Sequence, residues 1–280
     1  MEILTDLSSM QARCLDLRRQ GKRIAFVPTM GYLHDGHLSL LQEGRQRGDI
    51  LALSIFVNPT QFGPKEDLAA YPRDLKRDLD IARRAGVDLV WTPTPQDVYP
   101  EGYATYVDVE GLTDTLCGAS RPGHFRGVTT VVCKLFNVVQ ADLALFGEKD
   151  FQQLAVIRRM TRDLNLPVEI VGMPIVREED GLAMSSRNVY LSGGERSQAP
   201  AISQGIALAQ KRACEGEHSS RTLLAEVRSL IEAQPLARID YLQICHALTL
   251  QEQEKVDADA VLLMAVFVGS TRLIDNSYLL

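Results

Sequence analysis

The sequence predicts an α/β protein with a Rossmann-like, doubly wound parallel sheet and a smaller α+β C-terminal domain. Five short apolar segments occur in the first 175 residues, namely RIAFVPTM, DILALSIFV, VDLVWTP, ADLALFG and VEIVGMPI. Continuous apolar runs of this length are typical of parallel strands that are buried on both faces. Helical patterns lie between them, and this alternation of strands with helices indicates an open, doubly wound sheet.

Three segments in this part of the chain have the spacing of amphipathic helices. RDLKRDLDIARRAG ends at Gly86, and glycine commonly terminates helices. KDFQQLAVIRRMTRDL carries apolar residues from Phe151 to Leu164 at helical spacing, and GVTTVVCKLFNVV is the third predicted helix.

The pattern changes near Pro174. Two helices are predicted around residues 197–214 and 220–233. DYLQICHA, AVLLMAVFV and TRLIDN follow, with the composition of strands in a small antiparallel sheet. We therefore expect two domains, residues 1–175 and residues 176–280.

Composition and charge argue against several functional classes. Hydrophobic residues make up 45% of the chain and charged residues 24%, as in ordinary globular proteins. The net charge is -6 and the basic residues are scattered along presumed helices, so we expect no nucleic-acid partner. The five cysteines include no Cys-x-x-Cys pair, which fits a reducing cytoplasm. A signal peptide and a long apolar span are not apparent, so we expect a cytoplasmic protein without a membrane partner.

The segment after the first predicted strand, VPTMGYLHDGHLSLL, carries the most chemistry. Gly31 and Gly36 have the spacing of P-loop glycines, but His37 and Leu38 occupy the positions of the phosphate-binding Lys and Ser/Thr. A P-loop is therefore rejected. If a helix begins here, His34 and His37 share one face at its N-terminus, where free N–H groups and a partial positive charge suit phosphate. Gly36 leaves room for a nucleotide against the backbone. A zinc site would need a third ligand, and no Glu-x-x-His or Cys partner lies nearby.

Two more loops follow predicted strands at the carboxyl edge of the sheet, where ligands bind in open α/β sheets. SIFVNPTQF carries Asn58 and Gln61, and the Gln amide suits a hydroxyl or a carboxylate. FGEKDFQQL carries Lys149, which could hold phosphate, and Asp150, which could cap the helix or hold a ribose. Gln153 lies one turn after Lys149 and is expected to face the same crevice.

The last informative element, EEDGLAMSSRN, lies at the predicted domain junction. Met184-Ser185-Ser186-Arg187 combines two hydroxyls with a guanidinium. Such a loop can close over a triphosphate, although taken alone it could equally be a solvated turn.

These motifs together resemble a known family. HxGH after the first strand and Met-Ser-Ser-Arg after the fifth resemble the HIGH and KMSKS elements of the nucleotidylyltransferase superfamily, which includes class I aminoacyl-tRNA synthetases. More narrowly, VPTMGYLHDGHLSLL, SIFVNPTQF, RPGHFRGV, FGEKDFQQL, DGLAMSSRN and RLIDN resemble the motifs of pantothenate synthetases, in the same order, from about Gly21 to Asn276. The resemblance implies that ATP activates (R)-pantoate as pantoyl adenylate, which β-alanine then converts to pantothenate, with release of AMP and pyrophosphate.

The resemblance also implies site residues and a homodimer. Pantoate is expected to lie between Gln61 and Gln153 and to bind Asn58 as well, and β-alanine is expected later near Gln61. His37 matches the proton donor, His34 helps to hold the phosphates, and Lys149 and Arg187 complete the catalytic set. The residues implied to bind ATP are Met30, Gly31, Tyr32, Leu33, His34, Asp35, Gly36, His37, Gly147, Glu148, Lys149, Asp150, Val176, Met184, Ser185, Ser186 and Arg187. The family commonly has Met where this chain has Thr60.

The residues themselves favour attack of a carboxylate on the α-phosphate of ATP. The chain lacks a P-loop lysine and an obvious pair of magnesium carboxylates, which would favour transfer of the γ-phosphate. Mg²⁺ is expected to arrive bound to the ATP phosphates rather than at a protein metal site. Three alternatives stay open: a nucleotidylyltransferase for another acid or phosphate, a zinc hydrolase that uses His34 and His37, and a nucleotide sensor without turnover.

Overall fold

The computed structural model describes residues 1–64 and 66–280, which form two compact units. The first consists of Met1–Asp114, Arg121–Glu148 and Gln153–Pro174, and the second of Thr115–Ser120, Lys149–Gln152 and Ile175–Leu280. Two short segments from the first 174 residues therefore belong to a unit that is otherwise C-terminal. Within the described ranges, no helix combines the length and the apolar character needed to cross a membrane.

The first unit is built on a six-stranded parallel sheet with the order β1-β4-β3-β2-β5-β6. Its strands are β1 (Glu2–Leu4), β2 (Ile24–Thr29), β3 (Ile50–Ile55), β4 (Leu89–Trp91), β5 (Leu143–Gly147) and β6 (Glu169–Met173). The predicted α/β fold class and all of the predicted parallel strands are confirmed. The edge strand β1 was missed, because its apolar run is only two residues long, and the strand is held through parallel pairing with β4.

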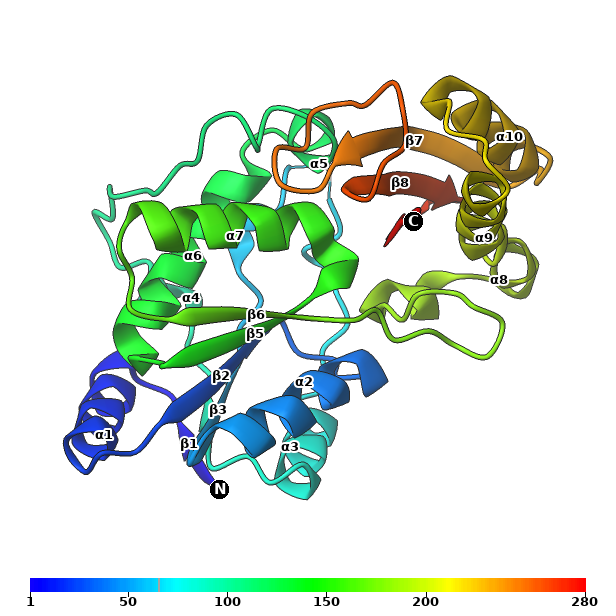
Figure 1. Cartoon of the computed structure of the whole chain (residues 1–280). Helices are drawn as coiled ribbons and strands as arrows, with labels where there is room; N and C mark the ends of the chain where they lie inside the picture. Colours follow the sequence, from blue (N-terminus) through cyan, green and yellow to red (C-terminus); the bar gives the residue numbers. More distant parts are fainter. Residues whose placement is uncertain (65) are drawn as a thin grey trace. The chain divides into compact units, whose positions relative to one another are not determined.

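Helices cover both faces of this sheet, as the doubly wound pattern requires. In Figure 1, α2 (Asp35–Arg47) and α3 (Leu75–Arg84) lie on one face, and α6 (His124–Val139) and α7 (Phe151–Asp163) lie on the other. Helix α1 (Leu7–Arg19) packs against α6. The short helices of the unit are η1 (Pro59–Gln61) and α4 (Pro95–Val98), and η2 (Glu148–Asp150) begins where β5 ends.

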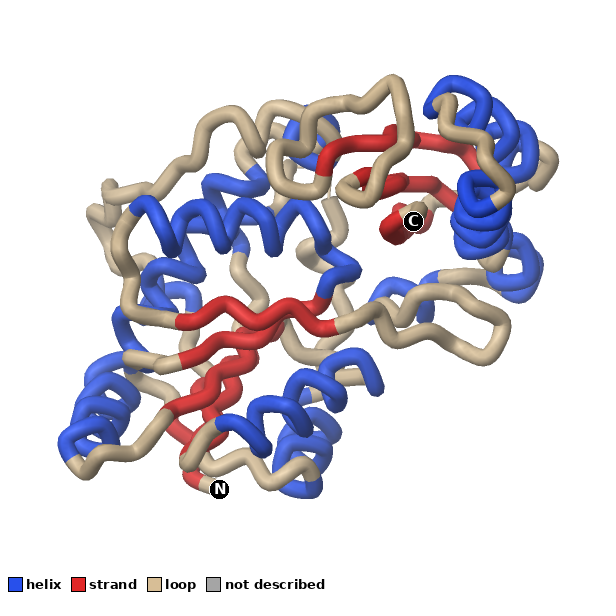
Figure 2. The backbone as a smooth tube through the Cα atoms, in the orientation of Figure 1, coloured by secondary structure: helices blue, strands red, loops and turns tan. Residues whose placement is uncertain are grey.

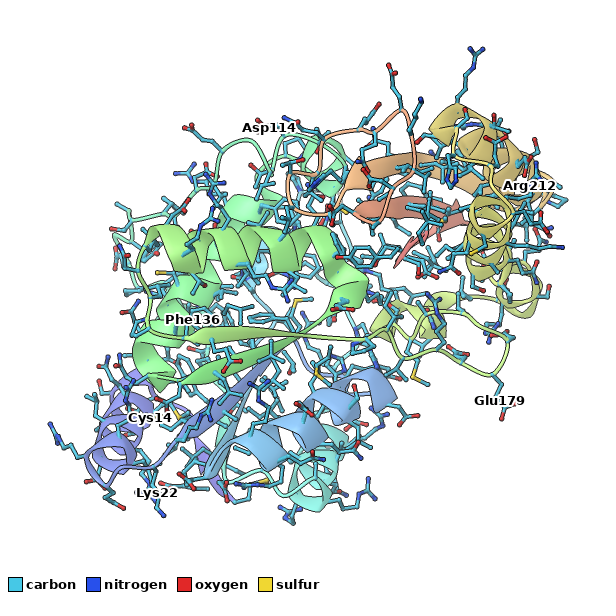
Figure 3. All side chains as sticks on the ribbon, viewed as in Figure 1. Cys14, Lys22, Asp114, Phe136, Glu179 and Arg212 are labelled. Carbon is cyan, nitrogen blue, oxygen red and sulfur yellow. The ribbon has the colours of Figure 1, made fainter. Side chains whose placement is uncertain are left out.

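Apolar side chains fill the space between the sheet and each helical layer. Leu40 and Leu41 of α2 and Ala82 of α3 pack with Val27 and Leu53 of the central strands, and all five are buried. On the opposite face, Phe136 of α6, which is labelled in Figure 3, meets Phe146 of β5 edge to face, with ring centroids 6.3 Å apart. These cores hold the carboxyl ends of the strands as a rigid base for the loops that follow them.

The second unit has the predicted three-stranded antiparallel sheet, and its strand order is β7-β8-β9. Figure 2 shows its strands beside the helices of the same unit. The elements are α5 (Cys117–Ser120), η3 (Ser186–Tyr190), α8 (Gly193–Gln198), α9 (Ala201–Cys214), α10 (Ser220–Glu232), β7 (Ala237–His246), β8 (Ala260–Val268) and β9 (Thr271–Tyr278). Ile206 of α9 and Val227 of α10 pack on Leu262 and Met264 of β8.

One predicted helix of this unit is divided in the structure. The segment 197–214 was expected to be a single helix, but α8 ends at Gln198 and α9 begins at Ala201. Pro200 is the N-cap of α9. Proline cannot donate a backbone hydrogen bond and its ring clashes with the preceding turn, so the helix is interrupted there.

Candidate active site

The carboxyl ends of β2 and β5 lie side by side where the strand order reverses. The chain runs outward from β2 through β3 to β4, and then starts again at β5 on the other side of β2. In open α/β sheets, ligands bind outside the carboxyl ends of the strands at this switch point. Met30 and Gly31 follow β2, Asn58 follows β3, and Gly147 ends β5. The structure therefore brings these predicted site residues to the same edge of one sheet.

The loop after β2 turns sharply into α2. Gly31 and Tyr32 have positive φ angles of 82° and 52°, and Leu33 is fully buried. His34 is the N-cap of α2, which begins at Asp35, so the predicted helix start is confirmed. A Cβ on Gly31 would lie 3.0 Å from an oxygen of Asp78, so glycine suits this position for both space and backbone conformation.

The two histidines form a capping box at the start of α2. Nδ1 of His34 accepts the N–H of Gly36 at 3.1 Å, and Nδ1 of His37 accepts the N–H of His34 at 3.2 Å. A ring nitrogen that accepts carries no proton, so each neutral ring has its hydrogen on Nε2. The ring centroids are 4.1 Å apart. The pair therefore supplies two Nε2–H donors at a helix N-terminus, a position that favours phosphate.

A buried carboxylate holds the backbone of this loop. Asp78 of α3 is 1% exposed and accepts the N–H groups of Tyr32 and Leu33, both at 2.7 Å. Burial raises the pKa of the Asp78 carboxyl, and the two N–H groups and Arg77 oppose this shift without cancelling it. Sequence reasoning missed Asp78, because it lies in a segment whose only visible signal was that of a helix.

The loop after β3 is organised by Asn58, which is 1% exposed. Its Oδ1 accepts the hydroxyls of Tyr99 at 2.8 Å and Thr60 at 3.0 Å. Its Nδ2 donates to Oε1 of Gln61 at 3.1 Å and to the carbonyl of Gly127 at 3.2 Å. Both the oxygen and the nitrogen of the Asn58 amide are therefore hydrogen-bonded to protein groups. This arrangement suits a residue that positions Gln61.

Thr60 and Tyr99 complete this network. Their hydroxyls lie 3.1 Å apart. Burial raises the pKa of Tyr99 to about 12, although hydrogen bonds with Thr60 and Asn58 oppose the shift, so the Tyr99 hydroxyl stays protonated at neutral pH. A methionine at position 60 could make neither of the Thr60 hydroxyl's bonds, so the Thr60 hydroxyl helps to orient Asn58.

Gln61 contacts the loop after β2 through its side chain, and its backbone contacts α6. Its Nε2 lies 3.1 Å from Sδ of Met30. Its carbonyl lies 2.9 Å from Nδ1 of His124, which is buried. Gly127 allows α6 to approach, because a Cβ there would lie 2.7 Å from the nitrogen of Gln61 and still closer to the carbonyl oxygen of Thr60.

An ion pair closes the same loop. Arg121 donates to both carboxylate oxygens of Glu66, at 2.7 and 2.6 Å, and to the Gln61 carbonyl at 3.3 Å. Burial acts to raise the pKa of Glu66, but hydrogen bonds and the charge of Arg121 outweigh it and lower the pKa. Arg121, His124 and Gly127 all come from the motif RPGHFRGV, to which sequence analysis assigned no role.

The predicted phosphate-binding residues of the second unit lie in two segments. Lys149 begins the segment 149–152, and its Nζ lies 3.2 Å from the carboxylate of Asp150. The other segment is a short hairpin in which Met184 donates to the carbonyl of Val176 at 3.0 Å. Ser185 then caps η3 by accepting the N–H of Arg187 at 3.2 Å. The hairpin thus brings together Val176 and the Met184–Arg187 loop.

The remaining predicted residues lie at the ends of elements. Glu148 follows β5, and Gly172 of β6 leaves space for its carboxylate. Gln153 is half-buried in the first turn of α7. In the described parts of the chain, no group of three or more His, Cys, Asp and Glu side chains is arranged to hold a metal ion.

Comparison with known proteins identifies the family. The family model for pantoate-beta-alanine ligase matches residues 2–278. The chain is 65% identical over 280 residues to the pantothenate synthetase of Syntrophotalea carbinolica, covering 100% of this chain and 99% of that protein.

Solved structures agree. The structure is similar to that of pantothenate synthetase from Thermus thermophilus, with a TM-score of 0.95, 48% identity and coverage of 100% and 99% of the two chains. It is also similar to the pantoate-beta-alanine ligase of Francisella tularensis complexed with beta-gamma ATP and beta-alanine, with a TM-score of 0.82, 31% identity and coverage of 100% and 98%. The resemblance drawn from the motifs is confirmed, and the chain belongs to the pantoate-beta-alanine ligase family.

Proposed function

We propose that this chain condenses (R)-pantoate with β-alanine in two steps, with ATP as co-substrate. A pantoate carboxylate oxygen attacks the α-phosphorus of ATP, the bond to the β-phosphate breaks, and pyrophosphate leaves. The amine of β-alanine then attacks the carbonyl carbon of pantoyl adenylate, loses a proton, and expels AMP. Membership of the ligase family and the ligands of the Francisella tularensis relative support this proposal.

The tautomers of His34 and His37 carry the assignment of the ATP site. Because Nδ1 of each ring is used by the cap, the Nε2–H groups can donate to phosphate oxygens at the N-terminus of α2. Donors fixed before the reaction stabilise charge that develops on the α-phosphate without rearranging. A Cβ on Gly36 would lie 2.9 Å from the His34 ring, so glycine here preserves both the cap and the space.

Lys149 and Arg187 are proposed to neutralise the β- and γ-phosphates as pyrophosphate departs, and the hydroxyls of Ser185 and Ser186 to donate hydrogen bonds to them. The reaction needs no nucleophile from the protein, because positioning and electrostatics dominate phosphoryl transfer. Mg²⁺ bound to the triphosphate would add positive charge there, and magnesium sites of this kind rely largely on substrate phosphates.

Pantoate is proposed to bind to the amides of Gln61 and Gln153, and β-alanine near Gln61. Gln61 is well suited to this role because Asn58, Arg121 and His124 hold both its side chain and its carbonyl. Asn58 contributes by orienting Gln61 rather than through a free amide. A cytoplasmic homodimer is proposed on the family resemblance, and light scattering should then give about twice the chain mass of 31.0 kDa.

Chromatography of the spent nucleotide tests the reaction directly. AMP and pyrophosphate should form in equal amounts with pantothenate, and pantoate alone should support exchange of labelled pyrophosphate into ATP. A panel of other carboxylic acids serves as the control for substrate choice. Stoichiometric ADP and inorganic phosphate would overturn the adenylate route, and equal exchange with unrelated acids would overturn the choice of pantoate.

A further inference from the structure

Two neighbouring residues of β9, Asp275 and Asn276, point to opposite faces of the antiparallel sheet, because side chains alternate along a strand. Both are buried, at 2% and 5% exposure. Buried polar side chains are costly unless they are hydrogen-bonded. Each of them contacts a different segment of the second unit that is proposed to bind the triphosphate.

Asn276 holds the lysine segment. Its Nδ2 donates to the backbone carbonyl of Lys149 at 2.9 Å. Tyr278 lies two residues after Asn276, on the same face of β9. Its ring meets that of Phe151 edge to face, with ring centroids 5.9 Å apart. The segment 149–152 is therefore attached to β9 at both Lys149 and Phe151.

Asp275 holds the hairpin that leads to the Met184–Arg187 loop. Its two carboxylate oxygens accept from the two terminal nitrogens of Arg177, at 2.7 and 2.9 Å. Arg177 also donates to the carbonyl of Gly181 at 3.0 Å, across the turn of the hairpin. A bidentate pair of this kind fixes orientation as well as distance. Oδ1 of Asp275 accepts the N–H of Asn276 at 2.8 Å, so the two anchors share one rigid piece of backbone.

We propose that Asp275 and Asn276 are a positioning pair, which sets Lys149 and the Met184–Arg187 loop at the spacing needed to hold one triphosphate. This proposal rests on the proposed roles of Lys149 and Arg187. It assigns a function to the RLIDN motif, which the reaction chemistry leaves unexplained. Groups that act on the same transition state must be held to within a fraction of an ångström, and residues behind them supply that rigidity.

The first test compares Asn276→Ala with Ser277→Ala. Each substitution removes a side-chain hydrogen bond made by β9, because Asn276 donates to Lys149 and Ser277 accepts from Gln210 at 2.9 Å. Asn276→Ala should lower kcat/KM for ATP in pantoate-dependent pyrophosphate exchange about tenfold, as expected for the loss of one hydrogen bond. It should spare the reaction of preformed pantoyl adenylate with β-alanine. Ser277→Ala should leave both half-reactions unchanged.

The second test is a double-mutant cycle with Lys149→Ala. If Asn276 acts through Lys149, Asn276→Ala should cause no further loss of exchange in the Lys149→Ala background. Equal activity of Asn276→Ala and Ser277→Ala, or losses that multiply in the double variant, would overturn the positioning role alone. If Lys149→Ala itself exchanges normally, the assigned phosphate role of Lys149 fails and the proposal fails with it.

Arg177→Lys tests the other anchor. Lysine keeps the charge beside Asp275 but cannot make the bidentate contact. Adenylation should fall several-fold while the second half-reaction is spared. An equal fall in both half-reactions would show that the Arg177–Asp275 pair serves folding only.

Discussion

The loops after β2 and β3 of the first unit are held in different ways. The loop after β2 is organised mainly by itself, because the His34 and His37 bonds span two and three residues. The loop after β3 is organised by distant parts of the chain. Asn58 bonds to Tyr99 and Gly127, which are 41 and 69 residues away, and the carbonyl of Gln61 contacts His124, 63 residues away.

Because of this difference, the two loops should respond to different kinds of substitution. In the histidine loop, a local cap determines which ring nitrogen carries a proton, so single side chains should dominate the effect on rate. In the Gln61 loop, the position of the Gln61 amide depends on how closely α6 approaches, so changes that alter packing should matter as much as changes to the amide. Asp78 is the exception in the first loop, because it reaches Tyr32 and Leu33 from 46 and 45 residues away.

The largest expected effect is on the histidine loop. His37→Asn keeps an acceptor near the position of Nδ1, so the cap should survive, but it removes the Nε2–H donor. We expect adenylation to slow by roughly 10²–10³ with little change in melting temperature, the usual result of removing one preorganised donor. His37→Gln is the matched variant, because its carbonyl oxygen can accept the N–H of His34 in the capping box while its NH₂ group still donates. Unaltered exchange in His37→Asn would show that the cap, and not the donor, is what this residue contributes.

Gly127→Ala should damage the Gln61 loop through packing alone. The added methyl would meet the backbone of Thr60 and Gln61, and neither side can move without separating α6 from η1. The free energy of unfolding should fall by about 3 kcal/mol, the upper range for overpacking, and pantoate KM should rise more than ATP KM. Gly193→Ala is the control, because a Cβ there has no neighbour within 4 Å. Denaturant titration and initial rates measure both; a wild-type pantoate KM would contradict the packing argument.

Asp78→Asn tests the long-range contact of the histidine loop. One of the two N–H groups would face an amide NH₂ instead of an oxygen, at a cost of about 1–2 kcal/mol in unfolding free energy. ATP KM should rise while pantoate KM changes less. Asp74→Asn is the control on the same helix, since Asp74 caps α3 by accepting the N–H of Arg77, and Asn caps helices equally well. Similar results for the two variants would remove the special role of Asp78.

The smallest effect concerns the Arg121–Glu66 pair and pH. Because the folded-state pKa of Glu66 is lowered, its contribution to stability is present above the ordinary glutamate pKa of about 4.3 and is lost as pH falls through the folded value. Glu66→Gln should therefore cost about 1 kcal/mol near neutral pH, and the difference from wild type should shrink below about pH 4. Asp163→Asn, which breaks the exposed Arg159–Asp163 pair, should leave the dependence of unfolding free energy on pH nearly unchanged. A difference in unfolding free energy between wild type and Glu66→Gln that stays constant down to low pH would contradict the pKa argument.

The sequence supported the fold class for a physical reason. Buried parallel strands require continuous apolar segments, and those segments are visible without any structure. β1 was not visible because an edge strand of three residues needs backbone pairing rather than apolar side chains. The break between α8 and α9 was visible in principle, since Pro200 interrupts the helical pattern.

By itself, the sequence determined the strand pattern, the HxGH segment with its helix start, and the set of motifs that marks the family, because all of these depend on residues close together in the chain. Only the tertiary structure decided that Asp78 holds the histidine loop, that Gly127 admits η1, and that Asn276 contacts Lys149. Each of these contacts joins residues between 45 and 127 positions apart. No local periodicity records such a contact, because it exists only after the sheets and helices have packed.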